Sequence, residues 1–237
     1  MEFKKQFFEV IDSTNRYALE HECAHGMVIY TDEQTAGIGR FKRPWQAAAG
    51  MNVMMSICVD IPEESRAVIG RLALFCGLAV TAALQQLGVE AQVKWPNDVL
   101  VAGKKLAGIL VETRGSKAVI GIGLNVNQLD FPDEVAAKAT SLALVTGTEL
   151  DRDVVMDAVL GQFAIYFDRF VAGTTDFVAE YERIMYGLGS WVKVDADQVL
   201  LLGIDASGTL RIRDEIGMER LVYSGAISFE SVYADML

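Results

Sequence analysis

The chain has 237 residues, of which 51% are hydrophobic and 22% are charged, so it can bury a substantial core as one large domain or as a large and a small one. Its net charge of -11 argues against a general nucleic-acid binder, which needs Lys and Arg to neutralise phosphates. Arg66 and Arg71 interrupt the longest apolar stretch before it reaches the length of a membrane span, and the N-terminus lacks a secretory pattern, so we expect a cytoplasmic protein without membrane contacts.

The first half of the chain combines strand-like and helical patterns. A strand is predicted over residues 7–11, followed by a helix over 13–23 that Asp12 or Ser13 caps. Further strands are predicted over 27–31 and 52–59. A long, mostly apolar helix should then run over 63–87 and end at Gly88, as helix C-termini prefer. A helix this apolar is expected to pack against a sheet.

Four strands then follow in quick succession, over residues 91–95, 98–101, 105–114 and 118–124. Their short connections imply antiparallel neighbours, and therefore an α+β fold. Helices are predicted over 152–171 and 176–186, the first capped by Asp151 and the second by Thr174 or Thr175.

Beyond Gly187 the pattern changes to short strands separated by turn residues. The predicted strands cover 191–194, 199–204, 209–213 and 219–223, with a hairpin loop at 205–208. This pattern predicts a small β-barrel and places a domain boundary near residue 187.

The three cysteines give no support for a metal site. Cys23, Cys58 and Cys76 lack CxxC spacing, and the two histidines, His21 and His25, stand at a helix end and a turn. We expect three reduced thiols, with Cys58 and Cys76 as small core residues. The sequence leaves any metal ligands unknown.

The charge distribution indicates a site for a small anion. No acidic residue occurs between Glu33 and Asp60, yet Arg40, Lys42 and Arg43 cluster there among glycines. A basic, glycine-containing loop in an acidic protein is typical of an anion site.

The run KWPNDVLVAGKKLAGILVE, residues 94–112, is the most informative part of the chain. Pro96 cannot donate a hydrogen bond to a sheet, so the preceding strand should end there. The next two strands form a β-hairpin that places Lys105 beside the returning strand, whereas Lys104 is expected to be a solvated edge charge.

Four segments together resemble the biotin protein ligase family: Asp12–Asn15, Gln34–Trp45, Lys94–Glu112 and Gly121–Asn125. The resemblance implies a mixed, largely antiparallel sheet with packed helices, similar to class II synthetases, plus a small C-terminal SH3-like β-barrel. It implies a catalytic domain over residues 1–187 and an SH3-like domain over 188–237.

The same resemblance implies a two-step ATP-dependent reaction. Biotin is activated as biotinyl-5'-AMP and then transferred to a lysine of a biotin carboxyl carrier domain, with Mg²⁺ accompanying ATP and with possible homodimers. Relatives that also repress transcription carry an N-terminal DNA-binding domain. We expect none here, and therefore neither repressor activity nor a nucleic-acid partner.

Residue roles follow from the resemblance, position by position. Lys105 and Arg40 match catalytic residues. The biotin site is implied to comprise Ser13, Thr14, Asn15, Gln34, Gly37, Ile38, Gly39, Arg40, Lys105, Gly108 and Gly121, and the ATP site Arg40, Arg43, Trp45, Asn97, Lys105 and Asn125. Gly123, like Gly108 and Gly121, would let the backbone approach the ligand closely. Asp98 is a weaker candidate, either for magnesium or for holding neighbouring residues.

Purely structural explanations stay open for several of these residues. Ser13 or Thr14 is equally suited to cap the first helix. Trp45 either lies on adenine or anchors its loop in the core. Arg40 and Arg43 are either ligand contacts or solvated charges, and isolated strand glycines often mark bulges.

The nucleotide loop departs from the family pattern, which usually reads close to GRGRxGR. Here it reads GIGRFKR, so Ile38 replaces an arginine and Lys42 replaces a glycine. We therefore expect weaker retention of the adenylate. Two alternatives remain: a lipoate-type ligase of the same fold, and a non-catalytic protein that binds biotin or its adenylate.

Overall fold

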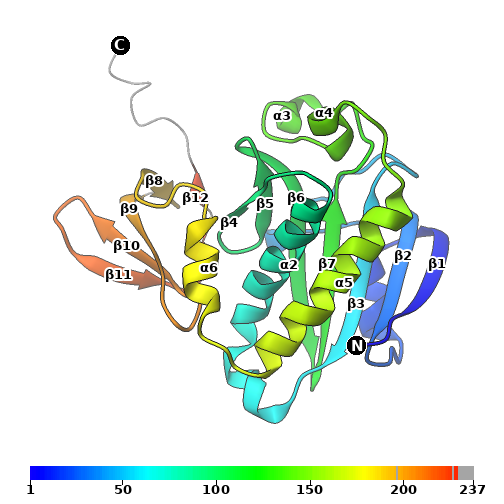
Figure 1. Cartoon of the computed structure of the whole chain (residues 1–237), viewed down its shortest axis with the longest axis horizontal. Helices are drawn as coiled ribbons and strands as arrows, with labels where there is room; N and C mark the ends of the chain where they lie inside the picture. The colour runs from blue at the N-terminus through cyan, green and yellow to red at the C-terminus, as the bar shows by residue number, and fades with distance from the viewer. Residues whose placement is uncertain (196, 226, 229–237) are drawn as a thin grey trace.

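The computed structural model describes residues 1–195, 197–225 and 227–228. Figure 1 shows a large sheet with the long helices α2 and α5 across one face, and a smaller sheet at one end of the molecule. The C-terminal strands of the chain build the smaller sheet.

The large sheet has the strand order β1-β2-β3-β7-β6-β5-β4. β1 and β2 are parallel and are joined through α1 (Thr14–Glu20), whereas all other neighbours are antiparallel. The predicted mixed, largely antiparallel sheet is confirmed. Its strands are β1 (Lys4–Ile11), β2 (Met27–Gln34), β3 (Val53–Asp60), β4 (Gln92–Lys94), β5 (Asp98–Val101), β6 (Lys104–Arg114) and β7 (Lys117–Leu124).

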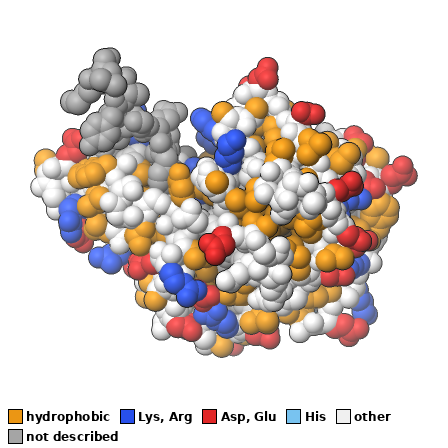
Figure 2. Space-filling view, turned by 45° about the horizontal axis from the view of Figure 1, so that its top comes forward, with side chains coloured by type: hydrophobic (Ala, Val, Ile, Leu, Met, Phe, Trp, Pro, Cys, Tyr) orange, Lys and Arg blue, Asp and Glu red, His pale blue; other side chains and the backbone are white. Residues whose placement is uncertain are grey.

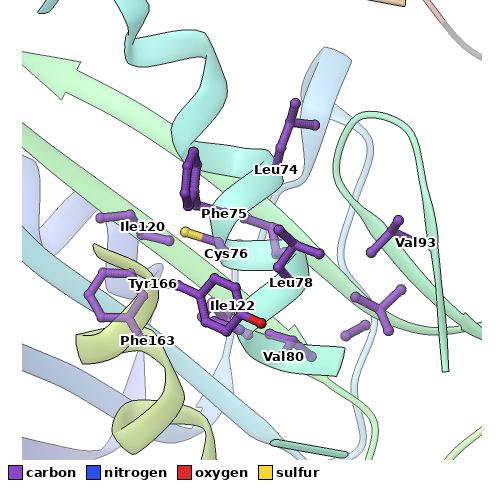
Figure 3. Packing of buried hydrophobic residues seen from close by; sticks show 14 of the residues in the cluster. Leu74, Phe75, Cys76, Leu78, Val80, Val93, Ile120, Ile122, Phe163 and Tyr166 are labelled. Carbon is purple, nitrogen blue, oxygen red and sulfur yellow. The ribbon is translucent and has the colours of Figure 1, made fainter. Parts of the chain in front are cut away.

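The main core lies between this sheet and the helices α2 (Leu72–Gln86) and α5 (Arg152–Val171). Figure 3 shows Phe75 and Leu78 of α2 packed near Phe163 of α5 and Ile120 of β7. Successive strand residues point to opposite faces, so Val119 and Cys58 belong to a second cluster that also contains Ala18 of α1. The face of the sheet opposite α2 and α5 is therefore the one that α1 covers in part.

Glu63–Gln86 is, among the described residues, the one helical segment long and apolar enough to cross a bilayer, and 61% of its apolar window is buried inside the fold. The prediction of a single helix here was wrong in one respect. Its first part is a 3-10 helix, η2 (Glu63–Arg71), with a kink at Val68, and α2 begins only at Leu72.

The smaller sheet is antiparallel, in the order β11-β10-β9-β8-β12. Its strands are β8 (Trp191–Val194), β9 (Asp197–Ile204), β10 (Leu210–Asp214), β11 (Glu219–Val222) and β12 (Ile227–Ser228). The predicted group of short C-terminal strands is confirmed, although β12 was not expected. A boundary at residue 187 stays a prediction, and residues 229–237 of the expected second domain lie outside the described residues.

Several helix ends and one cap differ from expectation. α1 ends at Glu20 and α6 (Phe177–Arg183) is shorter than predicted at its C-terminal end. Asp176 rather than a threonine precedes α6, and its side chain makes no capping bond. The short helices α3 (Asp133–Ala136) and α4 (Leu142–Thr146) were missed because four or five residues carry too little periodicity to detect. The predicted caps Ser13 and Asp151 are confirmed, and all three cysteines are buried free thiols.

One buried and one partly buried hydrogen bond join the C-terminal sheet to the rest of the fold. The indole Nε1 of Trp95 donates to the carbonyl of Gly208, 3.0 Å away, and the backbone N–H of Ile204 donates to the Glu182 carboxylate at 2.9 Å. The strand that opens the 94–112 run is thereby tied to the hairpin loop of the smaller sheet.

Replacing Trp95 with Phe should lower the free energy of unfolding by about 1–3 kcal/mol, because the variant leaves the Gly208 carbonyl without its donor and removes buried aromatic surface. Trp191, which is 44% exposed, provides the matched control: Trp191→Phe should change stability by less than about 0.5 kcal/mol. Urea denaturation measures both. Equal losses in the two variants would contradict the proposed link.

Candidate active site

A cleft of about 190 Å³ lies on the α1 face of the large sheet. Each of the four segments singled out in the sequence contributes to its lining. The predicted site residues that line it are Ser13, Thr14, Asn15, Gln34, Ile38, Gly39, Arg40, Arg43, Trp45, Asn97, Lys105, Gly108 and Gly121. Gly37 and Asn125 are the two predicted residues that do not.

The floor of the cleft is a patch of sheet without side chains. Gly108 and Gly123 are directly paired across β6 and β7, and Gly121 lies two residues before Gly123 on the same face. A Cβ atom at Gly123 would overlap the Trp45 indole, and one at Gly121 would overlap the Asn15 side chain. These glycines are therefore required for close approach.

Trp45 lies on this glycine floor and reaches toward Lys105. The Lys105 Nζ is 5.4 Å from the centre of the Trp45 ring, which is close enough for a cation–π interaction. The backbone N–H of Trp45 donates to the Gly37 carbonyl at 2.9 Å, so Gly37 fixes the backbone that carries Trp45 without lining the cleft itself. The Trp45 Nε1 is buried and has no hydrogen-bond partner among the described residues.

Lys105 forms an ion pair through its side chain and hydrogen bonds through its backbone. Its Nζ forms an ion pair with the Asp98 Oδ1 at 2.6 Å, across the paired strands β5 and β6. Its backbone N–H donates to Lys138, and its carbonyl accepts from the Thr140 N–H. The loop that carries α3 and α4 therefore supports the segment from which the Lys105 side chain extends into the cleft.

The basic loop folds into a short 3-10 turn, η1 (Arg40–Lys42). Phe41 and Lys42 have φ angles of 56° and 57°, in the left-handed region that favours glycine. The guanidinium of Arg40 lies 4.8 Å from the centre of the Phe41 ring, and its Nη1 donates to the Asn97 Oδ1 at 3.1 Å. Burial lowers the pKa of Arg40, partly offset by the nearby Asp98.

Lys94 adds a fourth basic side chain to the cleft lining, beside Arg40, Arg43 and Lys105. Burial lowers the pKa of Lys94, and neighbouring cations lower it further while Asp98 opposes them. Asp98 is the one carboxylate among the described residues that line the cleft. In Figure 2, some Lys and Arg side chains gather beside the lobe of α3 and α4, and both acidic and basic side chains are spread over the rest of the visible face. An anion that enters this cleft would thus meet an excess of positive charge.

The polar end of the cleft is formed by the start of α1. The Gln34 Oε1 accepts from the Thr14 backbone N–H at 2.9 Å and lies 3.1 Å from the Thr14 Oγ1. Ser13 both lines the cleft and caps α1, so its two proposed roles are compatible.

Asn125 lies behind the cleft, at the end of β7, and is buried. Its Nδ2 donates to the Thr140 carbonyl at 3.0 Å, and its backbone carbonyl accepts from Leu142. Its Oδ1 is buried with no hydrogen-bond partner among the described residues. In this arrangement Asn125 fastens the loop that supports Lys105.

Sequence reasoning assigned no role to several residues that build the site. Lys94 and Glu112 were visible in the run 94–112, whereas Ser56 carries no local signal because it reaches the site only through tertiary contacts. The C-terminal sheet also reaches the cleft, because Gly225 and Ile227 line it. Within the described part of the chain, no group of three or more His, Cys, Asp or Glu side chains could hold a metal ion.

Comparison with known proteins decides the family. Residues 7–128 match the biotin/lipoate A/B protein ligase family. The chain belongs to this family. It is 34% identical, over 241 residues, to the bifunctional ligase/repressor BirA of Bacillus subtilis, a match that covers 93% of this chain and 72% of that protein. It is 35% identical over 196 residues to the biotin--[acetyl-CoA-carboxylase] ligase of Mycobacterium tuberculosis, covering 81% of this chain and 71% of that enzyme.

Solved structures of the family have the same fold. The biotin protein ligase of Aquifex aeolicus in complex with biotin and ATP superposes with a TM-score of 0.87 at 30% identity, covering 94% of this chain and 97% of that one. This similarity includes the C-terminal sheet, since the match extends over almost the whole chain.

Gly123→Ala should displace the Trp45 indole from the floor of the cleft, because the new methyl group would occupy its place. The Trp45 fluorescence, identified by difference from a Trp45→Phe variant, should shift to longer wavelength as the ring becomes solvated. Gly161→Ala is the control, because a Cβ there meets open space. An unchanged Trp45 emission in Gly123→Ala would contradict the packing described.

Proposed function

We propose that this chain is an ATP-dependent biotin protein ligase, which forms biotinyl-5'-AMP and transfers the biotinyl group to a lysine of a biotin carboxyl carrier domain. The observation that carries the proposal is the position of Lys105. Its ammonium group lies above the glycine floor, next to Trp45 and Asp98, within a cleft lined by basic side chains. Family membership and the similarity to biotin ligases support the same conclusion.

In the first step the biotin carboxylate attacks the α-phosphorus of ATP, forming the mixed anhydride and releasing pyrophosphate. Two anionic groups must approach each other, so the site has to neutralise charge where the new bond forms. We assign this role to Lys105, whose flexible ammonium can leave Asp98 and contact both the carboxylate and the α-phosphate. Fixing both substrates in one cleft further lowers the entropic cost of the reaction.

The basic loop and the Trp45 ring are assigned to the nucleotide. Arg40 and Arg43 present planar guanidinium groups that can each bind two phosphate oxygens. Trp45 offers an aromatic face for adenine, and Asn97 lies within hydrogen-bonding distance of Arg40. Asn125 lies behind the cleft, so we assign it an indirect part in the ATP site, through the loop that supports Lys105.

The biotin head group is assigned to the end of the cleft formed by α1. Ser13, Thr14, Asn15 and Gln34 supply the polar contacts there. Gly108 and Gly121 line the same cleft and let the Trp45, Lys105 and Asn15 side chains lie close to the sheet. Ile38 and Gly39 form the wall contributed by the basic loop, whereas Gly37 does not line the cleft and acts through its hydrogen bond to Trp45.

Mg²⁺ is expected to accompany ATP. Asp98 fits a site of the usual kind, in which one or two carboxylates bind the ion together with phosphate oxygens and water. When bound, the ion would supply further neutralisation of phosphate charge. In the second step, the amine of the carrier lysine attacks the carbonyl carbon of the anhydride, and AMP leaves.

Lys105→Ala should reduce biotin-dependent exchange of labelled pyrophosphate into ATP by about 100-fold or more, on the order of 3 kcal/mol of transition-state stabilisation. Lys104→Ala is the matched control, because Lys104 is the exposed neighbour at the start of the same strand. Exchange at the parental rate in Lys105→Ala would remove this residue from the mechanism. Exchange with lipoate but not biotin would instead indicate a lipoate-type ligase, and exchange with neither would indicate a binding protein.

Ile38→Arg should slow the release of biotinyl-5'-AMP. Ile38 is 38% exposed and lines the cleft, so an arginine there would add a cation over the adenylate. The dissociation rate of preformed adenylate, followed by intrinsic fluorescence, should fall by roughly tenfold, as one charge-assisted hydrogen bond allows. A release rate equal to that of the parental protein would show that having Ile38 in place of the family's arginine does not affect how long the adenylate stays bound.

A further inference from the structure

The basic loop forms a small hairpin of its own at the cleft. Ile38 and Pro44 are bridged in antiparallel fashion, and the Gly39 N–H donates to the Arg43 carbonyl at 2.8 Å. Between these contacts the chain reverses direction over η1 (Arg40–Lys42). The loop therefore has a backbone structure of its own, in which one arginine begins the turn and another follows it.

The turn is made without a glycine. Phe41 has a φ of 56° and a ψ of 28°, and Lys42 has a φ of 57°, so two successive residues with side chains occupy the left-handed region. Each is less stable there than glycine would be, because its Cβ approaches neighbouring backbone atoms. Such a conformation persists only where surrounding contacts stabilise it.

The Phe41 ring makes contacts of this kind. The guanidinium carbon of Arg40 lies over the ring, 4.8 Å from its centre, and that of Arg43 lies 6.0 Å from the same centre. Both distances suit cation–π interactions. Phe41 is 63% exposed, so its ring gains little from burial. Its contacts with the two arginines are what give the ring a defined place.

Stacking on the ring leaves both arginines able to bind an anion. A guanidinium stacks through its flat face, whereas it donates hydrogen bonds from its edge, where it has five N–H donors. In Arg40 the edge Nη1 donates to the Asn97 Oδ1 at 3.1 Å while the group lies over Phe41. The same geometry allows edge donors of Arg40 and Arg43 to bind phosphate oxygens while the faces stay on the ring.

The two cations are also close enough to repel each other. Burial lowers the pKa of Arg40, Asp98 opposes this effect, and the charge of Arg43 lowers the pKa further. Each long side chain loses conformational entropy when it is immobilised. A contact that orders both side chains in the free protein therefore moves this cost from nucleotide binding to folding.

We propose that Phe41 is a positioning residue of the nucleotide site: its ring holds the guanidinium groups of Arg40 and Arg43 in place before ATP binds. The inference rests on the proposed function, in which these arginines bind phosphate oxygens. It gives a role to the position that the family pattern leaves variable, and it explains how the turn tolerates Lys42 in place of glycine.

Phe41→Leu should raise the apparent KM for ATP in pyrophosphate exchange by roughly tenfold, the effect of ordering one or two long side chains on binding. The maximum rate should change by less than about twofold, because bound phosphates order the same side chains. Phe41→Tyr keeps the aromatic face and should retain the parental KM. Phe7→Leu is the matched control, since Phe7 is an exposed phenylalanine of β1 that does not line the cleft.

A second measurement needs no enzymatic activity. Trypsin cleaves after Arg40 and Lys42, but not after Arg43, because proline follows it. The cleavage rate of the folded, ligand-free protein at these two bonds is divided by the rate for an unstructured peptide with the same loop sequence. This ratio should rise roughly tenfold in Phe41→Leu, as the loss of two weak cation–π contacts allows. It should keep the parental value in Phe41→Tyr and Phe7→Leu.

A KM for ATP and a cleavage ratio that both match the parental values in Phe41→Leu would overturn the proposal. Faster cleavage with an unchanged KM would also overturn it, because it would show a purely structural role. Equal losses in Phe41→Tyr and Phe41→Leu would exclude the aromatic face as the cause. A parental protein without pyrophosphate exchange would instead refute the proposed function, and the cleavage ratios would still decide whether the ring orders the loop.

Discussion

The site depends on a patch of sheet surface on which β6 and β7 expose only backbone. Gly108, Gly121 and Gly123 stand on one face of two central strands, and the side chains of Trp45 and Asn15 rest in the space that Cβ atoms would otherwise fill. The opposite face of the same strands is fully occupied by the core against α2 and α5. A rigid, well-packed layer therefore supports a surface that ligands and aromatic rings can approach closely, which is the combination that precise positioning of two reactants requires.

The cleft is lined mainly by positive charge, although the protein as a whole is acidic. The chain carries a net charge of -11, yet four of the five charged side chains lining the cleft are basic and Asp98 alone is acidic. Burial opposes this concentration of cations and lowers the pKa of both Lys94 and Arg40. Burying several cations close together costs free energy in the empty cleft. Negatively charged phosphate oxygens would offset that cost, so the arrangement favours nucleotide binding.

Much of the architecture follows from local patterns in the chain. Pro96 follows the end of β4, Gly88 follows α2, and the run 94–112 predicts β5 and β6 as a hairpin. The basic loop was identifiable from residue type and spacing, and Lys105 and the three glycines from the resemblance of their segments to the biotin protein ligase family. Ser56 and the position of Asn125 behind the cleft were not identifiable, because their contacts form where segments distant in sequence lie side by side. The kink at Val68 and the short helices α3 and α4 are also products of tertiary packing rather than of periodicity.

The most direct test of the whole account is transfer to a carrier. Purified protein, biotin, ATP and Mg²⁺ would be incubated with a biotin carboxyl carrier domain, and the intact mass of that domain followed by mass spectrometry. The account predicts that a single biotinyl group becomes attached, at one lysine, and that omission of ATP abolishes the product. A carrier domain that stays unmodified while biotinyl-5'-AMP accumulates on the protein would contradict the claim that this cleft completes both steps of the ligation.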